Sequence, residues 1–234
     1  MKRAALPFRY PGGKYYAMDI LQPYWEAVDC TEYREPFAGG ATVFFHKPKA
    51  ELNWLNDLDS ELMECYRTMQ DPFLREKMAE EFKSEIASKE RWKEIYESVP
   101  ENNYEIAKKY YYLNRTSFSG KLVSAAWGYR PKRSLPPERW FERIIPCGEA
   151  LEGVRLTNLD FSDVIRAPGD NVLLYVDPPY YLPPKRFGNT KFIKVINILS
   201  IFNVYIHWTL NVLVMIWNSW KFVFRDDNNL ERLV

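Results

Sequence analysis

Four consecutive residues, Asp177-Pro178-Pro179-Tyr180, combine a carboxylate, a rigid turn and an aromatic ring. Two prolines in a row cannot donate to a β-ladder, so they end any strand that precedes them. The Asp177 carboxylate and the Pro178 carbonyl could each accept one N–H of an exocyclic nucleobase amine. That pair would draw the nitrogen toward tetrahedral geometry and turn its lone pair onto an electrophile, while Tyr180 stacks on the base. The ordinary alternative is a strand-ending turn with a solvated aspartate.

The residues before this motif indicate its place in a fold. Residues 171–176 read N-V-L-L-Y-V, a short apolar run rich in β-branched and aromatic side chains, which predicts a buried strand. The motif therefore follows the carboxyl end of a strand. Open α/β sheets bind their ligands at that end.

Two glycine-rich stretches nearer the N-terminus suit the close approach of a ligand. Residues 8–14 read F-R-Y-P-G-G-K, in which the glycines form a turn and Lys14 could bind a carboxylate. An exposed surface turn is the alternative for this stretch. Residues 32–45 read E-Y-R-E-P-F-A-G-G-A-T-V-F-F, which predicts a strand into Glu35, a small-residue loop and a helix that opens near Ala41. That order is typical of a nucleotide pocket.

Acidic residues follow two further predicted strands. The strand within residues 50–57 ends at Asp57, which comes 18 positions after Gly39. An acidic residue at about this spacing is well placed to bind ribose hydroxyls. A later strand leads into Asp160 and Phe161, where the carboxylate could read an adenine amino group and the ring could pack on the purine. The alternative for each aspartate is a helix N-cap, and for Phe161 a place in the core.

Residues 60–114 have the apolar spacing of helices with charged outer faces, and Pro72 and Pro100 divide them. A short helix is also expected from about Tyr16 to Gln22, ended by Pro23. Basic residues then cluster among aromatic and hydroxyl side chains. They suit nucleic-acid phosphates, with a solvated basic loop as the alternative. The candidate residues are Asn114, Arg115, Thr116, Lys121, Arg130, Lys132 and Arg133.

The composition limits the class of protein. The 234 residues carry a formal net charge of +1, so nucleic-acid binding must depend on a local patch. Three widely spaced cysteines and two histidines offer neither a disulfide framework nor a metal-site pattern, which favours a reducing, cytoplasmic setting and no metal. The N-terminus has too few apolar residues for a signal peptide.

Six motifs, in order, resemble the D12 class of adenine-specific DNA methyltransferases, the Dam-like family. Together they extend over roughly residues 8–187, and their shared order makes the resemblance specific. The motifs are Y-P-G-G-K at 10–14, E-P-F-A-G-G at 35–40, L-N-D-L-D at 55–59, Y-L-N-R-T-S-F-S-G at 112–120, L-D-F at 159–161 and D-P-P-Y at 177–180.

The resemblance implies that S-adenosyl-L-methionine is the methyl donor and that N6 of adenine in double-stranded DNA is the acceptor, reached by base flipping. It implies an α/β, Rossmann-like methyltransferase fold with a helical target-recognition insertion. The catalytic residues would be Asp177, Pro178, Pro179 and Tyr180. The donor would be bound by Tyr10, Lys14, Phe37, Ala38, Gly39, Asp57, Asp160, Phe161 and Asp177. The insertion, with the candidates between Asn114 and Arg133, would contact DNA.

We expect residues 1–59 and 151–234 to form one discontinuous catalytic domain, and residues 60–150 to form the insertion. Ala41 stands where the family often has a second glycine. Because alanine is small, we expect this departure to do little harm.

The segment from Val195 to Trp220 is a larger departure, since it contains no charged residue over 26 positions. Its length could span a bilayer, but several asparagines interrupt it, and a membrane helix does not suit a DNA-modifying enzyme. Buried strands are one interpretation, and a shifted reading frame after about Thr190 is another. A shifted frame would leave a catalytically impaired DNA- or donor-binding relic. N4-cytosine methylation is a further alternative, since the same motif suits both amines.

Overall fold

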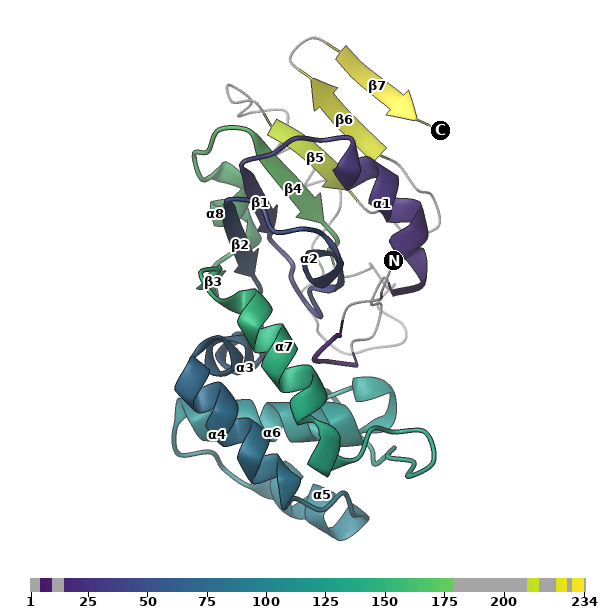
Figure 1. Cartoon of the computed structure of the whole chain (residues 1–234), viewed down its shortest axis with the longest axis vertical. Helices are drawn as coiled ribbons and strands as arrows, with labels where there is room; N and C mark the ends of the chain where they lie inside the picture. The colour runs from purple at the N-terminus through teal and green to yellow at the C-terminus, as the bar shows by residue number, and fades with distance from the viewer. Residues whose placement is uncertain (1–4, 10–14, 179–209, 215–221, 227–228, 234) are drawn as a thin grey trace. The chain divides into compact units, whose positions relative to one another are not determined.

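The structure is a computed structural model that describes residues 5–9, 15–178, 210–214, 222–226 and 229–233 (Figure 1). Its contacts divide the chain into two compact units, each described by itself. The first unit comprises Met1–Asp19, Gly39–Pro48 and Asp59–Asn158, and the second comprises Ile20–Ala38, Lys49–Leu58 and Leu159–Val234. The helical insertion predicted for residues 60–150 thus groups with two more N-terminal segments.

A parallel sheet forms the centre of the second unit. Its strands are β1 (Glu32–Glu35), β2 (Leu52–Asn56), β4 (Val172–Val176) and β5 (Leu210–Val214). They lie in the order β2-β1-β4-β5, and every paired neighbour in this series is parallel. Helix α8 (Phe161–Arg166) precedes β4, and β6 (Phe222–Asp226) pairs antiparallel with β7 (Asn229–Leu233). The parallel sheet confirms the predicted α/β, Rossmann-like class.

Strand β4 is buried at all five positions, as its apolar sequence predicts. Strand β1 is different, because it reads E-Y-R-E and still lies in the middle of the sheet. Its side chains alternate between the two faces and pair two positions apart. Arg34 Nε donates to Glu32 Oε1 at 2.7 Å on one face, and the Tyr33 hydroxyl donates to Glu35 Oε1 at 2.6 Å on the other. These pairs satisfy polar groups that burial would otherwise penalise.

Arg34 also fastens α8 to the sheet. Its guanidinium donates to the carbonyls of Val164 at 3.1 Å, Ala167 at 2.7 Å and Pro168 at 2.8 Å. These carbonyls lie at the C-terminal end of α8, where a positive charge also favours the helix dipole. The buried arginine therefore positions the loop that leads into β4.

The first unit is mainly helical. Its helices are α2 (Thr42–His46), α3 (Ser60–Gln70), α4 (Pro72–Lys83), α5 (Lys89–Glu97), α6 (Asn103–Thr116) and α7 (Phe141–Leu151), and β3 is Arg155–Thr157. Helix α3 packs on α6 and α7, α4 on α7, and α5 on α6 (Figure 1). Local sequence explains where four of them begin. Asp59, Asp71, Ser88 and Asn102 are N-caps whose side chains accept a backbone N–H, and Pro72 is the first residue of α4.

Aromatic side chains fill the core of this unit. The ring of Trp140 meets that of Phe82 edge-on, with centroids 4.9 Å apart, and Phe8 meets Tyr66 in the same way at 5.2 Å. Tyr111 lies between these groups, within 6.0 Å of Phe8 and 5.5 Å of Phe82. The high aromatic content therefore serves packing here.

Helix α1 (Met18–Glu26), after a 3-10 turn over Tyr15–Ala17, corrects one prediction. It was expected to end at Pro23, but it continues past this proline to Glu26. Proline removes only one helical hydrogen bond, and its own carbonyl still accepts from the Ala27 N–H at 3.1 Å. Leu21 and Trp25, four positions apart, are buried and stabilise the helix across the proline.

Part of the uncharged segment Val195–Trp220 is a sheet strand. Leu210–Val214 form β5, and Leu210 faces Val172 of β4. The interpretation as sheet is thus confirmed for these residues, while residues 195–209 and 215–220 lie outside the described part. A shifted reading frame stays a hypothesis. None of the helices in the described residues is long and apolar enough to cross a membrane.

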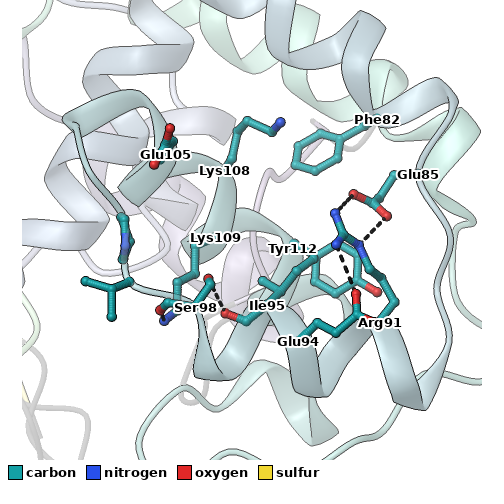
Figure 2. A pocket seen from close by; sticks show the side chains of 12 residues that line it. Phe82, Glu85, Arg91, Glu94, Ile95, Ser98, Glu105, Lys108, Lys109 and Tyr112 are labelled. Atoms are coloured by element: carbon teal, nitrogen blue, oxygen red, sulfur yellow. Dashed lines mark hydrogen bonds and ion pairs between the residues drawn. The ribbon is translucent and has the colours of Figure 1, made fainter.

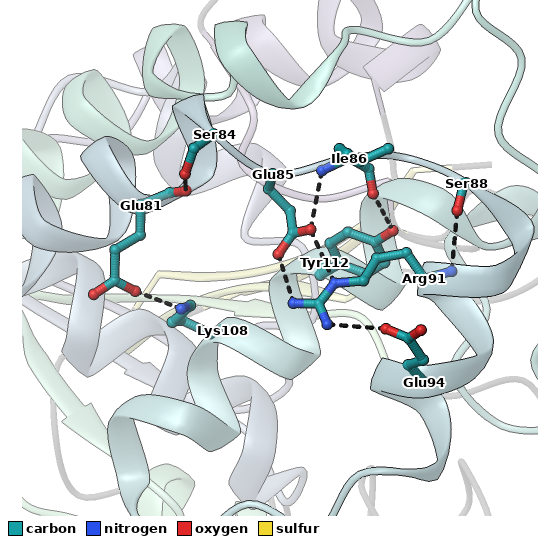
Figure 3. A network of polar contacts seen from close by, with 9 residues as sticks. All are labelled: Glu81, Ser84, Glu85, Ile86, Ser88, Arg91, Glu94, Lys108 and Tyr112. Carbon is teal, nitrogen blue, oxygen red and sulfur yellow. Dashed lines mark hydrogen bonds and ion pairs between the residues drawn. The ribbon is translucent and has the colours of Figure 1, made fainter.

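A cavity of about 240 Å³ lies beside α5 and α6 (Figure 2). Arg91 makes two 3.0 Å bonds to Glu85 and one of 3.1 Å to Glu94 (Figure 3). Burial alone would raise the pKa of Glu85, but the bonds from Arg91 and the Ile86 N–H, with the charges of Arg91 and Lys108, outweigh it and lower that pKa. The acidic and basic groups balance in number, so this cavity has no net charge. The charged lining residues are Glu85, Glu94, Glu105, Arg91, Lys108 and Lys109.

Candidate active site

Three predicted site residues follow the carboxyl ends of neighbouring strands in the second unit. Glu32 of β1 faces Leu52 of β2 and Val172 of β4. Five positions further along the three segments stand Phe37, Asp57 and Asp177. All three strands are parallel, so these residues lie at the same carboxyl edge of the sheet, the edge at which open α/β sheets bind their ligands.

The two aspartates at this edge are only partly exposed to solvent. Asp57 and Asp177 are half-buried, and Pro178 is buried. The alternative that Asp57 caps the following helix is wrong, because Asp59 fills that position and accepts the Leu62 N–H at 3.1 Å. Asp57 therefore does not cap α3. Its contact with a ribose stays a prediction.

Asn56, the last residue of β2, joins the loops around this edge. Its side chain is fully buried. The Nδ2 group donates to the carbonyls of Pro36 at 3.1 Å and Leu159 at 3.0 Å, and Oδ1 accepts from the Leu159 N–H at 2.8 Å. The Asn56 carbonyl accepts from the Ala38 N–H at 2.8 Å. One residue thus positions the loop after β1 and the loop before α8, a role that sequence reasoning missed.

An aromatic pair lies in these two loops. The rings of Phe37 and Phe161 are stacked, with centroids 5.0 Å apart and an interplanar angle of 27°. Both side chains are half-buried, so Phe161 is not an ordinary core residue. Its neighbour Asp160 is the N-cap of α8, which was one of its two interpretations. Oδ1 of Asp160 accepts from both the N–H and the hydroxyl of Ser162, at 2.9 Å and 2.5 Å.

The glycine loop has the backbone geometry that its sequence suggests. Gly39 has a φ of 47°, in the left-handed region that glycine tolerates best. Its carbonyl accepts the buried Tyr66 hydroxyl at 2.7 Å. Ala41 also has a positive φ, 46°, and it precedes α2. The expectation that alanine does little harm here needs correction, because a Cβ in this region costs about 1–2 kcal/mol.

A buried carboxylate at the end of β1 was also missed. Glu35 is 1% exposed and accepts the Tyr33 hydroxyl. Burial, followed by the charge of Glu35, raises the pKa of Tyr33 well above its usual value, so the phenol stays protonated. The sequence signal was present, since E-P-F-A-G-G begins with this residue, but its spacing does not show burial.

Four predicted site residues lie outside the described part of the chain. They are Tyr10 and Lys14 of the first glycine turn, and Pro179 and Tyr180 of the D-P-P-Y motif. Their roles stay predictions.

The predicted DNA-contacting residues belong to the first unit. Arg115, Arg130 and Arg133 line one cavity of about 290 Å³, together with Arg9, which sequence reasoning did not select. Lys121 and Lys132 are exposed and do not line it. The structure thus brings the arginines together around one cavity, which the two lysines do not line.

Asn114 and Thr116 have internal partners instead of a free surface. Both are buried. Asn114 Oδ1 accepts from the Arg9 N–H at 2.9 Å, and its Nδ2 donates to the carbonyls of Arg9 and Gly120, each at 3.2 Å. The Thr116 hydroxyl donates to the Tyr112 carbonyl at 2.6 Å. The expectation of direct DNA contact is therefore revised for these two residues, which position their neighbours.

The described residues contain no cluster of side chains suited to a metal site. Over those residues, no group of three histidine, cysteine, aspartate or glutamate side chains could bind a metal ion.

Comparison with known proteins gives a consistent result. Residues 10–186 match the family described as D12 class N6 adenine-specific DNA methyltransferase, about three quarters of the chain. The Type II methyltransferase M.CviBI of Paramecium bursaria Chlorella virus NC1A is 30% identical over 177 residues, which cover 74% of this chain and 67% of that protein.

Two further relatives are similar at lower identity. The DNA N-6-adenine-methyltransferase of Escherichia phage P1 is 26% identical over 196 residues, or 79% of this chain and 25% of that protein. The Type II methyltransferase M1.LlaDCHI of Lactococcus lactis subsp. cremoris is 26% identical over 195 residues, or 74% of this chain and 65% of that protein. The chain thus spans about two thirds of two relatives and a quarter of the third.

Proposed function

Because this chain belongs to the D12 class N6 adenine-specific DNA methyltransferase family, we propose that it transfers a methyl group from S-adenosyl-L-methionine to N6 of adenine in double-stranded DNA. The proposal rests on one observation: Phe37, Asp57 and Asp177 stand in matching register just after three parallel strands, at the carboxyl edge of the sheet. Family membership supports the reaction, and this geometry supports the assignment of residues.

The residues at this edge fit the donor's nucleoside. Asp57 follows β2 and would accept hydrogen bonds from the ribose hydroxyls. The ring of Phe161 would pack on adenine, with Phe37 behind it. The two bonds to Asp160 both use Oδ1, so Oδ2 can accept from the adenine amino group. Tyr10 and Lys14 would bind the donor's methionine end, as their place in the Y-P-G-G-K motif implies. The bound donor supplies an electrophilic methyl group on a sulfonium.

The target amine would be held by Asp177 and Pro178. The Asp177 carboxylate and the Pro178 carbonyl would each accept one N–H of N6, which directs its lone pair toward the methyl group. Proline makes this carbonyl rigid, so the two acceptors are positioned before the base arrives. Tyr180 would stack on the flipped adenine, because the amine cannot reach this edge from inside a duplex. Catalysis would then depend mostly on orientation.

The decisive experiment is methyl transfer from labelled S-adenosylmethionine to unmethylated duplex DNA, followed by base analysis. We expect the label in N6-methyladenine, and Asp177→Ala should abolish it. Asp170→Ala removes an exposed carboxylate just before β4 and should leave the rate unchanged. Label in N4-methylcytosine would overturn the choice of base. A donor that binds without any transfer would indicate an impaired relic.

A further inference from the structure

The arginine cavity of the first unit differs from the other cavity in charge. Arg9, Arg115, Arg130 and Arg133 line it, and no acidic residue of the described part of the chain does. The cavity beside α5 and α6 is also lined by charged side chains, but there three glutamates balance three basic residues. A cavity lined by four positive charges and no carboxylate favours the binding of an anion.

The four guanidinium groups have no acidic partners within the described residues. None of the ion pairs found there involves any of them. The Arg115 Nε atom is buried and lacks a hydrogen-bond partner among the described residues. Arg9 uses Nη1 to donate to the Arg115 carbonyl at 3.1 Å, which brings the two residues together. A buried donor without an acceptor is costly, so a ligand that supplies one would be favoured.

Burial and nearby positive charge add to this cost for Arg9 and Arg115. Burial, followed by the charge of Arg115, lowers the pKa of Arg9. Burial is also the largest cause that lowers the pKa of Arg115. A bound anion would offset both effects, because an opposite charge nearby favours the protonated form.

The backbone around the cavity is well ordered by hydrogen bonds. Phe118 N–H donates to the Ala126 carbonyl at 2.7 Å, and Gly128 N–H donates to the Thr116 carbonyl at 2.9 Å. A Cβ on Gly128 would lie 2.3 Å from the Phe118 Cα, so only glycine allows this close approach. The cavity wall is therefore built in place before any ligand binds.

Arg130 and Arg133 are set by a compact turn. The Arg133 and Ser134 N–H groups both donate to the Arg130 carbonyl, at 2.9 Å and 2.7 Å. The Arg130 N–H donates in turn to the Ser134 hydroxyl at 3.1 Å. Asn114 fixes Arg9 by bonding both its backbone N–H and its carbonyl. Local hydrogen bonds thus hold arginines from three separate stretches of the chain around one cavity.

We propose that Arg9, Arg115, Arg130 and Arg133 together bind one backbone phosphate of DNA. Guanidinium groups match phosphate oxygens in geometry and remain charged, and the hydroxyls of Ser119 and Ser134 also line the cavity. The inference rests on the proposed function, since it takes DNA as the partner. It adds Arg9 as a phosphate ligand and Asn114 as the residue that positions it.

The first test measures equilibrium binding of a DNA duplex across a salt series. Arg9→Ala and Arg115→Ala should each weaken binding about tenfold and reduce the salt slope by up to about one, because the pocket neutralises a single phosphate. Arg139→Ala is the matched control, because it also removes one positive charge but from an exposed residue paired with Glu142. It should leave both quantities unchanged. Arg9→Lys should recover part of the loss, which separates charge from folding.

The second test identifies the phosphate by replacing DNA phosphates one at a time with neutral methylphosphonates. At one position the replacement should weaken wild-type binding but not that of Arg9→Ala or Arg115→Ala. Losses that add independently at every position would refute the pocket. A loss for Arg9→Ala that depends on one particular base pair would show base reading instead. Inorganic phosphate should compete with DNA more strongly than chloride at equal ionic strength. Equal competition would also overturn the site.

The two proposals fail in different ways. If wild-type protein methylates adenine but the arginine variants keep its salt slope, the reaction stands and the phosphate pocket is wrong. If wild-type protein binds DNA with the expected slope but transfers no methyl group, the pocket stands and the proposed function is wrong.

Discussion

Replacing Asn56 should destabilise the two loops of the candidate active site that its side chain holds. Its buried amide makes three hydrogen bonds to the backbone of Pro36 and Leu159. Each such bond contributes about 0.5–1.5 kcal/mol, and a buried carbonyl left without a partner costs more. Pro36 is buried, whereas Leu159 is exposed and water can replace part of its loss. Asn56→Ala should therefore lower the free energy of unfolding by about 3 kcal/mol.

Asn56→Asp sharpens this prediction, because it keeps the shape and changes one donor into an acceptor. The new carboxyl would keep the bond from the Leu159 N–H but direct its second oxygen at two carbonyls. Burial and these carbonyls should raise its pKa in the folded state above the unfolded value of about 3.9. The folded state then binds more protons, so stability falls as the pH rises through the folded-state pKa. Relative to wild type, the variant should be less destabilised at pH 5 than at pH 8.

The assay is urea unfolding at both pH values, with S-adenosylmethionine affinity measured on the same samples. Asn53→Ala is a matched control on the same strand. Asn53 is also buried, but its side chain bonds to the backbone of Ala50, at the opposite end of β2. It should cost stability without weakening the donor affinity. Equal donor affinities for the two alanine variants, or a pH-independent deficit for Asn56→Asp, would refute the reasoning.

Three further predictions concern the frame around the site. Ala41→Gly should raise the melting temperature by about 1–2 °C, because relief of the strained positive φ at this position outweighs the added entropy of the unfolded chain. A lower melting temperature would show that Ala41 is not strained. Arg34→Ala should cost about 3–5 kcal/mol in urea unfolding, because it leaves Glu32 and three carbonyls without their buried partner; a loss below about 1 kcal/mol would show that the anchor is dispensable. The lowered pKa of Glu85 means that its pairing stabilises the fold above its unfolded pKa and is lost as the pH falls. Glu85→Gln should flatten the pH dependence of stability below about pH 4.5 by less than about 1 kcal/mol, and an unchanged profile would exclude this contribution.

Local sequence was sufficient for much of the fold. The strand into Glu35, the strand before Asp57 and the buried strand before Asp177 all form where periodicity and turn residues place them. Helix starts at Ser60 and Pro72 follow from caps and proline that act within one turn. Order along the chain then placed Phe37, Asp57 and Asp177 at one edge, because parallel strands share their carboxyl ends.

Long-range pairing decided the rest. Asn56 and Leu159 are 103 positions apart, and Arg9 and Asn114 are 105 apart, so no periodicity links them. Spacing could not tell that Asn114 is buried while Arg130 is exposed. It also could not show that β1 satisfies its charges by pairing them on each face.

The sequence by itself was enough to identify the methyltransferase family, because its motifs are recognised by residue type and by their order along the chain. Only the tertiary structure decided which side chains share a site. Burial and hydrogen-bond partners depend on segments far apart in the chain. That is why Arg9 enters the arginine cavity, and why Asn56 lies beneath the predicted donor site.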